Sequence, residues 1–204
     1  MNIKSKQIID ELELVLGKFA NEITNEDLNN ITELKIRNFD VDGSVMEFYL
    51  EDLSLFNNLN KISFTDMIIE IDTLNYIYNS NITELNLHNC ELMCTIDKPF
   101  EKIETLRVDY TDNFKEDYLR FFPNVKELVF KGYELTKELP SNIKVLNIVD
   151  TKVNDVSLIE KANLDRLYIS KEEYNKDDYY KNKLNIFVYD DNNIYLVNNG
   201  DQNE

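Results

Sequence analysis

Apolar residues recur at one fixed spacing through most of the 204-residue chain. The clearest copy spans residues 82–92 and reads Ile-Thr-Glu-Leu-Asn-Leu-His-Asn-Cys-Glu-Leu. Its positions 1, 4, 6, 9 and 11 are Ile82, Leu85, Leu87, Cys90 and Leu92. The alternation at positions 4 to 6 predicts a short strand with positions 4 and 6 facing inward and positions 3, 5 and 7 facing outward.

Six further copies of this strand pattern are present. Counting from the first apolar residue of each, they are Ile31-Leu34-Ile36, Leu59-Ile62-Phe64, Ile103-Leu106-Val108, Val125-Leu128-Phe130, Ile143-Leu146-Ile148 and Leu164-Leu167-Ile169. The steps between successive copies, 82–92 included, are 28, 23, 21, 22, 18 and 21 residues. The sequence therefore predicts a series of seven aligned strands.

This spacing resembles the leucine-rich repeat, whose pattern is L-x-x-L-x-L-x-x-N/C-x-L. The resemblance covers residues 31–170 and implies an α/β fold, a right-handed β-α superhelix with a curved parallel sheet, of a short, irregular intracellular type. Position 11 is filled by Val41, Ile69, Leu92, Leu135 and Val153, with Phe114 as a substitute in the fourth copy. Position 9 departs from the family: Cys90, Thr111 and Thr151 fit, whereas Phe39, Met67 and Tyr133 do not.

The ends of the chain predict caps. Residues 8, 9, 12, 15, 16 and 19 are apolar at helical spacing, which predicts an N-terminal helical cap within 1–30. Thr24 and Asp27 form a capping-box variant before a second helical turn. Residues 184–189 and 194–197 predict a hairpin in a C-terminal β cap, 171–197, followed by a flexible tail, 198–204. One domain with both caps is expected.

The connecting segments differ from one another. Residues 71–78 have helical spacing, and so do Phe114, Tyr118 and Phe122 ahead of Pro123, which should end that helix. The 18-residue step after Val125 favours an extended or 3₁₀ connection. Residues 42–44 predict a turn, and residues 45–56 suit either a helix or a strand.

Composition narrows the class of partner. The formal net charge of −17 argues against nucleic acid as the main ligand, because phosphate contacts need clustered basic residues. It leaves basic proteins as plausible partners. No apolar run is long enough to span a membrane, and two cysteines suggest no disulfide framework, so a cytoplasmic protein, monomeric by itself, is expected.

Candidate chemistry is sparse, and a non-enzymatic protein is predicted. Cys90, His88 and Asp109 could form a nucleophilic group, but Cys90 should face inward and His88 outward. Two cysteines with His88 give too few ligands for structural zinc. With four glycines there is little scope for a phosphate loop, and the paired aspartates lack the spacing of a calcium loop. No cofactor or metal is therefore expected.

The outward positions of the strands are the default binding surface, called the concave face in this repeat family. They carry six basic and four acidic residues, so most of the acidity should lie elsewhere. An apolar cluster next to basic residues resembles the centre of a protein-binding surface. The predicted binding residues are Lys35, Arg37, Arg107, Val129, Lys131, Val145, Val149, Arg166 and Tyr168. The alternative is that the hairpin or residues 174–180 cover the apolar cluster.

The resemblance implies a protein-interaction scaffold that binds a protein partner through the concave face and its acidic flanks. Two other functions stay open at this point. One is an accessory subunit of a large assembly, such as a ribosome or another ribonucleoprotein, in which acidic surfaces meet basic proteins. The other is an inhibitor or regulator of an enzyme or toxin.

Overall fold

The computed structural model describes residues 3–38, 47–181, 185–190 and 193–197. The chain divides into two compact units. Unit 1 comprises residues 1–95 and 111–113, and unit 2 comprises residues 96–110 and 114–204. Whether the chain unfolds as one domain stays a prediction.

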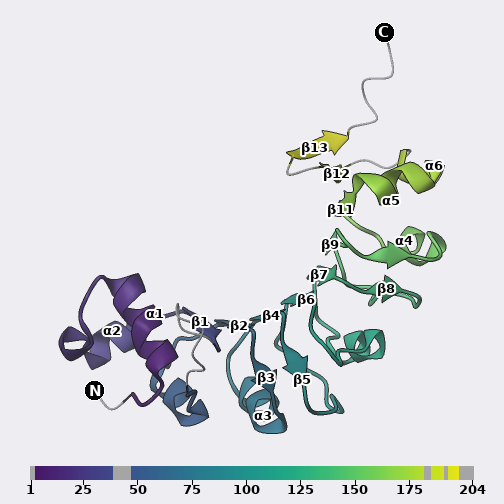
Figure 1. Cartoon of the computed structure of the whole chain (residues 1–204). Coiled ribbons are helices and arrows are strands. Elements are labelled where there is room, and N and C mark those ends of the chain that lie inside the picture. The colour runs from purple at the N-terminus through teal and green to yellow at the C-terminus, as the bar shows by residue number, and fades with distance from the viewer. Residues whose placement is uncertain (1–2, 39–46, 182–184, 191–192, 198–204) are drawn as a thin grey trace. The chain divides into compact units, whose positions relative to one another are not determined.

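Unit 1 contains a parallel sheet of repeat strands (Figure 1). Its strands are β1 (Glu33–Arg37), β2 (Lys61–Thr65) and β4 (Glu84–His88). The register aligns Leu34 with Ile62 and Ile62 with Leu85, so equivalent repeat positions lie side by side. These three side chains are buried, which confirms position 4 as an inward position.

Unit 2 contains the other four repeat strands in the same parallel arrangement (Figure 1). They are β6 (Thr105–Asp109), β7 (Glu127–Lys131), β9 (Val145–Asn147) and β11 (Arg166–Ser170). All seven predicted strands are thus present. Two more strands extend the sheet of unit 2: β12 (Ile186–Asp190) pairs parallel with β11, and β13 (Asn193–Val197) pairs antiparallel with β12.

Position 11 of the repeat forms a second, shorter set of strands. In unit 1, β3 (Ile68–Ile69) pairs parallel with β5 (Glu91–Leu92). In unit 2, β8 (Glu134–Leu135) pairs parallel with β10 (Lys152–Val153). The apolar residue at position 11 is buried in each of these strands, as the repeat pattern predicts. Val41, at the same position of the first copy, lies outside the described residues.

The connections between strands are short and varied. The predicted helix after the second strand is α3 (Ile71–Asn79). The one predicted ahead of Pro123 is a 3₁₀ helix, η3 (Glu116–Phe121), with Phe114 buried before it. Within residues 45–56 the described part forms a 3₁₀ helix, η2 (Leu50–Leu55), while the turn at 42–44 lies outside the described residues. A short helix, α4 (Ser157–Glu160), precedes β11.

The N-terminal residues form α1 (Lys6–Leu16), a 3₁₀ turn η1 (Ala20–Glu22) and α2 (Asn25–Asn30). The predicted capping box at the start of α2 is present, since the Thr24 side chain accepts from the Asp27 backbone N–H. The apolar face of α1 is shorter than predicted. Val15, within the last turn of α1, is 57% exposed. Phe19 is 73% exposed and lies beyond the helix, because Gly17 adopts a left-handed conformation that ends it.

A buried carboxylate ties the start of unit 1 to η2. One oxygen of Asp52 accepts the backbone N–H groups of Lys4 at 2.9 Å and Ser5 at 2.6 Å, at the start of α1. The Tyr49 backbone N–H donates to the Ser5 hydroxyl at 2.8 Å. These contacts bring residues separated by more than forty positions together and give the otherwise unpartnered N–H groups of a helix start an acceptor.

In unit 2 two short helices, α5 (Lys171–Lys176) and α6 (Asp178–Lys181), follow β11. The stretch in which they lie, residues 170–183, is rich in Lys, Glu, Asp and Tyr, a composition that predicts a solvated loop or a short helix. Tyr180 is instead fully buried, and α5 packs against β11 and β12. Leu184 of the predicted hairpin and the predicted tail 198–204 lie outside the described residues.

Gly132 in unit 2 lies under the ring of Tyr110. It has a φ of +83°, and a Cβ added there would be 2.3 Å from Tyr110 Cδ1. The Tyr110 hydroxyl donates to Asp150 at 2.9 Å, which holds the ring over the glycine. Both the backbone conformation and the close approach therefore require glycine at position 132.

Gly132→Ala should lower the free energy of unfolding by about 2–4 kcal/mol, because overpacking adds to the cost of an L-residue at positive φ. Gly17→Ala is the matched control: Gly17 has a φ of +63° but nothing within 4 Å, so a loss of about 1 kcal/mol is expected. Urea denaturation followed by circular dichroism measures both. Tyr110→Ala in the Gly132→Ala background should restore part of the loss, and equal losses for the two alanine variants would contradict the steric explanation.

Candidate functional site

The outward face of the unit 2 sheet is organised in rows across its strands. The register places one row through β7, β9, β11, β12 and β13 as Val129, Asn147, Tyr168, Phe187 and Leu196. A second row is Glu127, Val145 and Arg166. Since directly paired residues project on the same side of a sheet, these side chains form one continuous surface, which we call the outer face of unit 2.

Two of the predicted binding residues are buried rather than exposed. Val129 is 4% exposed and lies in the middle of the sheet, paired with Arg107 on one side and Asn147 on the other. Val149 is 7% exposed, because β9 ends at Asn147 and the alternation of strand residues no longer applies two positions later. The expected exposed cluster of valines therefore does not exist in that form.

The apolar part of the outer face lies further along the sheet than predicted. Tyr168 stacks on Phe187 with ring centroids 4.6 Å apart, and Tyr189 lies 6.3 Å away in a tilted arrangement. Ile194 and Leu196 on β13 continue this surface and are 55% and 48% exposed. The hairpin does not fold over Tyr168. It extends the sheet beside it.

The predicted binding residues do not include the hairpin residues Phe187, Tyr189, Ile194 and Leu196. The sequence pattern led to the interpretation of the hairpin as a cap, and not as part of the outward face of the sheet. The alternation of Ile186, Phe187, Val188 and Tyr189 was a usable signal, since it places Phe187 and Tyr189 opposite the buried pair. The alternation could not predict that β12 pairs parallel with β11, because this pairing depends on the helices α5 and α6 that connect the two strands.

The charges on the outer face are partly neutralised within it. Arg107 and Glu127 form an ion pair of 2.7 Å across adjacent strands. Lys131 and Arg166, in contrast, form no ion pair with any residue of the described part of unit 2. Arg166 lies two residues before Tyr168 on β11 and pairs with the half-buried Val145, whereas Lys131 lies on β7, two residues after Val129.

The outward positions of unit 1 are more polar. Lys61 lies between two carboxylates, 3.3 Å from Glu33 and 3.1 Å from Glu84. Although partial burial of the ammonium acts in the opposite direction, these carboxylates hold the pKa of Lys61 above its ordinary value. Lys35 approaches Glu33 at 3.7 Å, and both Lys35 and Arg37 are exposed. The outward positions of β1, β2 and β4 thus carry charged and polar residues and no aromatic residue.

The candidate nucleophile Cys90 is a structural thiol. Its side chain is buried, and Sγ lies 3.4 Å from the backbone oxygens of Phe64 and His88. Burial raises the pKa of Cys90 to about 11, so the thiol stays protonated at neutral pH. His88 is exposed on the outward side, so the two side chains diverge as the strand alternation predicts.

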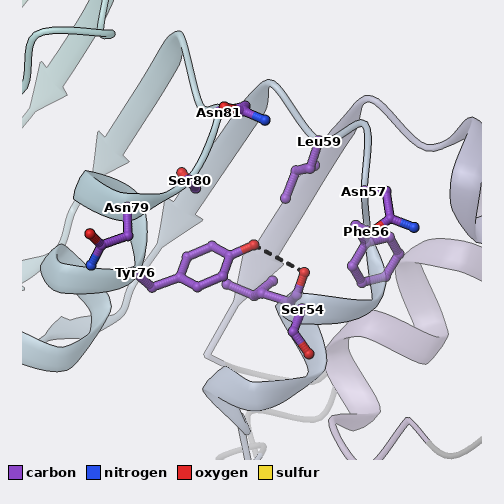
Figure 2. A pocket seen from close by; sticks show the side chains of 9 residues that line it. Ser54, Phe56, Asn57, Leu59, Tyr76, Asn79, Ser80 and Asn81 are labelled. Carbon is purple, nitrogen blue, oxygen red and sulfur yellow. Dashed lines mark hydrogen bonds between the residues drawn. The ribbon is translucent and has the colours of Figure 1, made fainter.

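Two pockets lie away from the outward faces. Figure 2 shows one of about 190 Å³ in unit 1, where Tyr76 of α3 donates to the backbone oxygen of Leu53 at 3.0 Å. Its rim is mostly amide and hydroxyl groups, including Ser54, Asn57 and Asn79. The second, of about 470 Å³ in unit 2, contains the buried Glu173, which pairs with Lys176 at 3.0 Å.

Both pockets are lined by a mixture of polar and apolar side chains, and the buried carboxylate of Glu173 in the second is paired with Lys176. Among the described residues, no group of three or more His, Cys, Asp or Glu side chains could hold a metal ion. The helices of the described ranges are all too short or too polar to cross a bilayer.

The fold is similar to that of an internalin. The crystal structure of the internalin inlF from Listeria monocytogenes matches 91% of this chain with a TM-score of 0.50 and 16% sequence identity. Internalins are leucine-rich repeat proteins, and the parallel sheets described above agree with that fold. This chain spans about half, 51%, of the internalin's length.

At this level of identity the likeness concerns the fold alone. No protein-family model matches the chain. No curated protein matches it either. The comparison thus supports a mixed α/β fold with parallel sheets.

Cys90 should resist alkylation in the folded protein. At pH 8, iodoacetamide should modify the half-buried Cys94 faster than Cys90 by about tenfold or more, because Cys90 is buried and its pKa is about 11. Peptide mass spectrometry after timed quenching measures both rates, and both cysteines should react alike in 8 M urea, about the usual denaturing concentration. Rapid modification of Cys90 in the folded chain would show that it is accessible and reactive.

Val149→Asp should lower the free energy of unfolding by about 2–4 kcal/mol, because it places a carboxylate in a buried site. Val145→Asp, four residues earlier on β9, is the matched control. It is half-buried beside Arg166, and a change of less than about 1 kcal/mol is expected. Urea denaturation of both variants tests this. Similar stability of the two variants would mean that Val149 is exposed after all.

Proposed function

We propose that this chain is a non-enzymatic protein-binding module that engages a protein partner through the outer face of unit 2. The observation that carries the proposal is the combination, on one sheet face, of stacked aromatic rings, exposed aliphatic residues and two cations that have no ion-pair partner in the described part of unit 2. Such a combination matches the composition of energetically important protein-binding centres, in which aromatic residues and arginine predominate. The general role of this fold in protein interaction agrees with it.

Tyr168 is the proposed anchor. Its ring is held in place by stacking on Phe187, so little side-chain entropy is lost when a partner covers it. Lys131 and Arg166 would then meet carboxylates of the partner around this centre. Because the chain as a whole carries a net charge of −17, such local cations would set the orientation of the partner more than they would attract it from a distance.

The two alternatives from the sequence, an accessory subunit of a large assembly and an inhibitor of an enzyme or toxin, use the same kind of surface and differ in the partner. A cytoplasmic location and a monomeric state also remain predictions. Sedimentation of native complexes separates these cases, since a subunit of a large particle moves with that particle and an inhibitor forms a small one-to-one complex.

The test is a native pulldown from source cells with the wild-type chain and with Lys131→Glu/Arg166→Glu, followed by a sedimentation gradient and quantitative mass spectrometry. A true partner should be recovered with the wild type and fall by about tenfold with the charge reversal, because two carboxylates would face its acidic groups. Tyr168→Ala should give a similar loss.

The matched control is Lys152→Glu/Lys161→Glu, which makes the same charge change on exposed residues of β10 and of the end of α4 in unit 2. It should leave recovery unchanged. If both double variants lose the same proteins equally, the partner responds to net charge and not to the outer face, and the proposed site is wrong. Circular dichroism melts of all the variants establish that they are folded.

A further inference from the structure

Strand β13 ends the sheet of unit 2 with an open edge. It pairs with β12 on one side, and no strand of the described residues pairs with its other side. Its sequence Asn-Ile-Tyr-Leu-Val contains no charged residue and no proline, which are the usual devices that protect an exposed edge from pairing. All but its last residue are exposed.

The first strand of unit 1 shows the opposite treatment. Helix α1 packs against β1, and the Glu11 carboxylate accepts the backbone N–H of Lys35. Burial beside the strand raises the pKa of Glu11, and the charges of Lys35 and Arg37 partly offset this. The edge of β1 is thus covered and one of its N–H groups is satisfied, whereas β13 has no such cover among the described residues.

The register identifies which backbone groups of β13 are open. Two residues separate Asp190 from Asn193, so this closing pair of the hairpin exchanges hydrogen bonds, and so do the alternate pairs at Tyr195 and Val197. The N–H and C=O groups of Ile194 and Leu196 therefore point away from β12. Their side chains lie on the outer face, in line with Tyr189 and Phe187.

We propose that β13 takes an extended strand of a protein partner, with an apolar centre and basic flanks, and so adds it to the sheet of unit 2. The open N–H and C=O groups of Ile194 and Leu196 require an extended backbone, and their exposed side chains favour apolar neighbours. The basic flanks follow from charge, because the chain as a whole carries a net charge of −17. This inference deepens the proposed function, since the added strand would continue the outer face.

A second copy of this chain fits the edge less well. Pairing of β13 with itself would engage only five residues of each copy, whereas a stable interface uses roughly twenty or more a side. Each copy also carries a net charge of −17, so two copies repel one another. A basic segment of another protein has neither disadvantage.

The test uses a fluorescein-labelled synthetic peptide, Lys-Lys-Thr-Val-Thr-Val-Thr-Lys-Lys, as the probe. Fluorescence anisotropy should show saturable binding to the full chain, and hydrogen exchange should show slower exchange of the Ile194 and Leu196 amides. The same peptide with proline at its central threonine should bind at least about tenfold more weakly, because proline cannot complete the ladder. A version with glutamate in place of the four lysines should also bind weakly.

Leu196→Pro removes one outward N–H without removing a bond to β12, and Leu196→Ala is the matched control that shortens the side chain and keeps the N–H. The proline variant should bind the peptide about fivefold more weakly than the alanine variant, which corresponds to one hydrogen bond. Because the peptide comparisons use only the wild-type chain, they decide the matter even if Leu196→Pro disturbs the hairpin.

Three outcomes would overturn the inference. These are equal binding of the proline-containing peptide, equal binding of the glutamate version, and dimerisation of the free chain through β13 in sedimentation equilibrium.

Lys131→Glu/Arg166→Glu separates this inference from the proposed function. If that variant loses the cellular partner while peptide binding and amide protection persist, the edge is a distinct element of the site. If only the protection of the Ile194 and Leu196 amides by the peptide is lost, the proposal that the outer face binds the partner is unaffected.

Discussion

In-register pairing of parallel strands is the constraint on which the rest of each unit depends. Because Leu34, Ile62 and Leu85 occupy the same register position in unit 1, their burial fixes the outward direction of every neighbouring residue. A shift of one residue would expose this entire set and bury its charged neighbours. The inward face therefore determines the outward face, and a functional surface can be identified in each unit from the core alone.

The turn after each strand adapts to whatever side chain stands at position 9. Cys90 in unit 1 and Thr151 in unit 2 direct their side chains to the backbone oxygen of the residue at position 6 in the preceding repeat. Tyr133, at the same position, stacks on Phe130, with ring centroids 4.2 Å apart. Hydrogen bonding and aromatic packing are thus alternative ways to stabilise the turn after the strand. The strands can therefore keep their register although the residue at position 9 varies.

The strands, the helix α3 and the capping box at Thr24 could be predicted because each depends on residues close in sequence. The binding face could be predicted only in part. Arg166 and Tyr168 follow from strand alternation, but the burial of Val149 depends on where β9 ends, and the role of Phe187 depends on a pairing partner more than ten residues away. The exposure of Phe19 likewise depends on a single glycine that ends α1. Local pattern predicts direction, whereas exposure depends on the neighbouring elements.

The edge strands β1 and β13 differ in how their outward backbone groups are treated, and this difference bears on function. A covered edge such as β1 adds stability and prevents pairing, while an open edge exposes unsatisfied N–H and C=O groups that water must solvate. Covering β13 would need only another amphipathic helix like α1. Its uncharged sequence, together with aliphatic side chains aligned with Phe187 and Tyr168, makes the edge continuous with the outer face. A partner strand added there would satisfy these backbone groups and enlarge the apolar surface at once. The unpaired groups of β13 would thus give unit 2 a directional site for an extended chain.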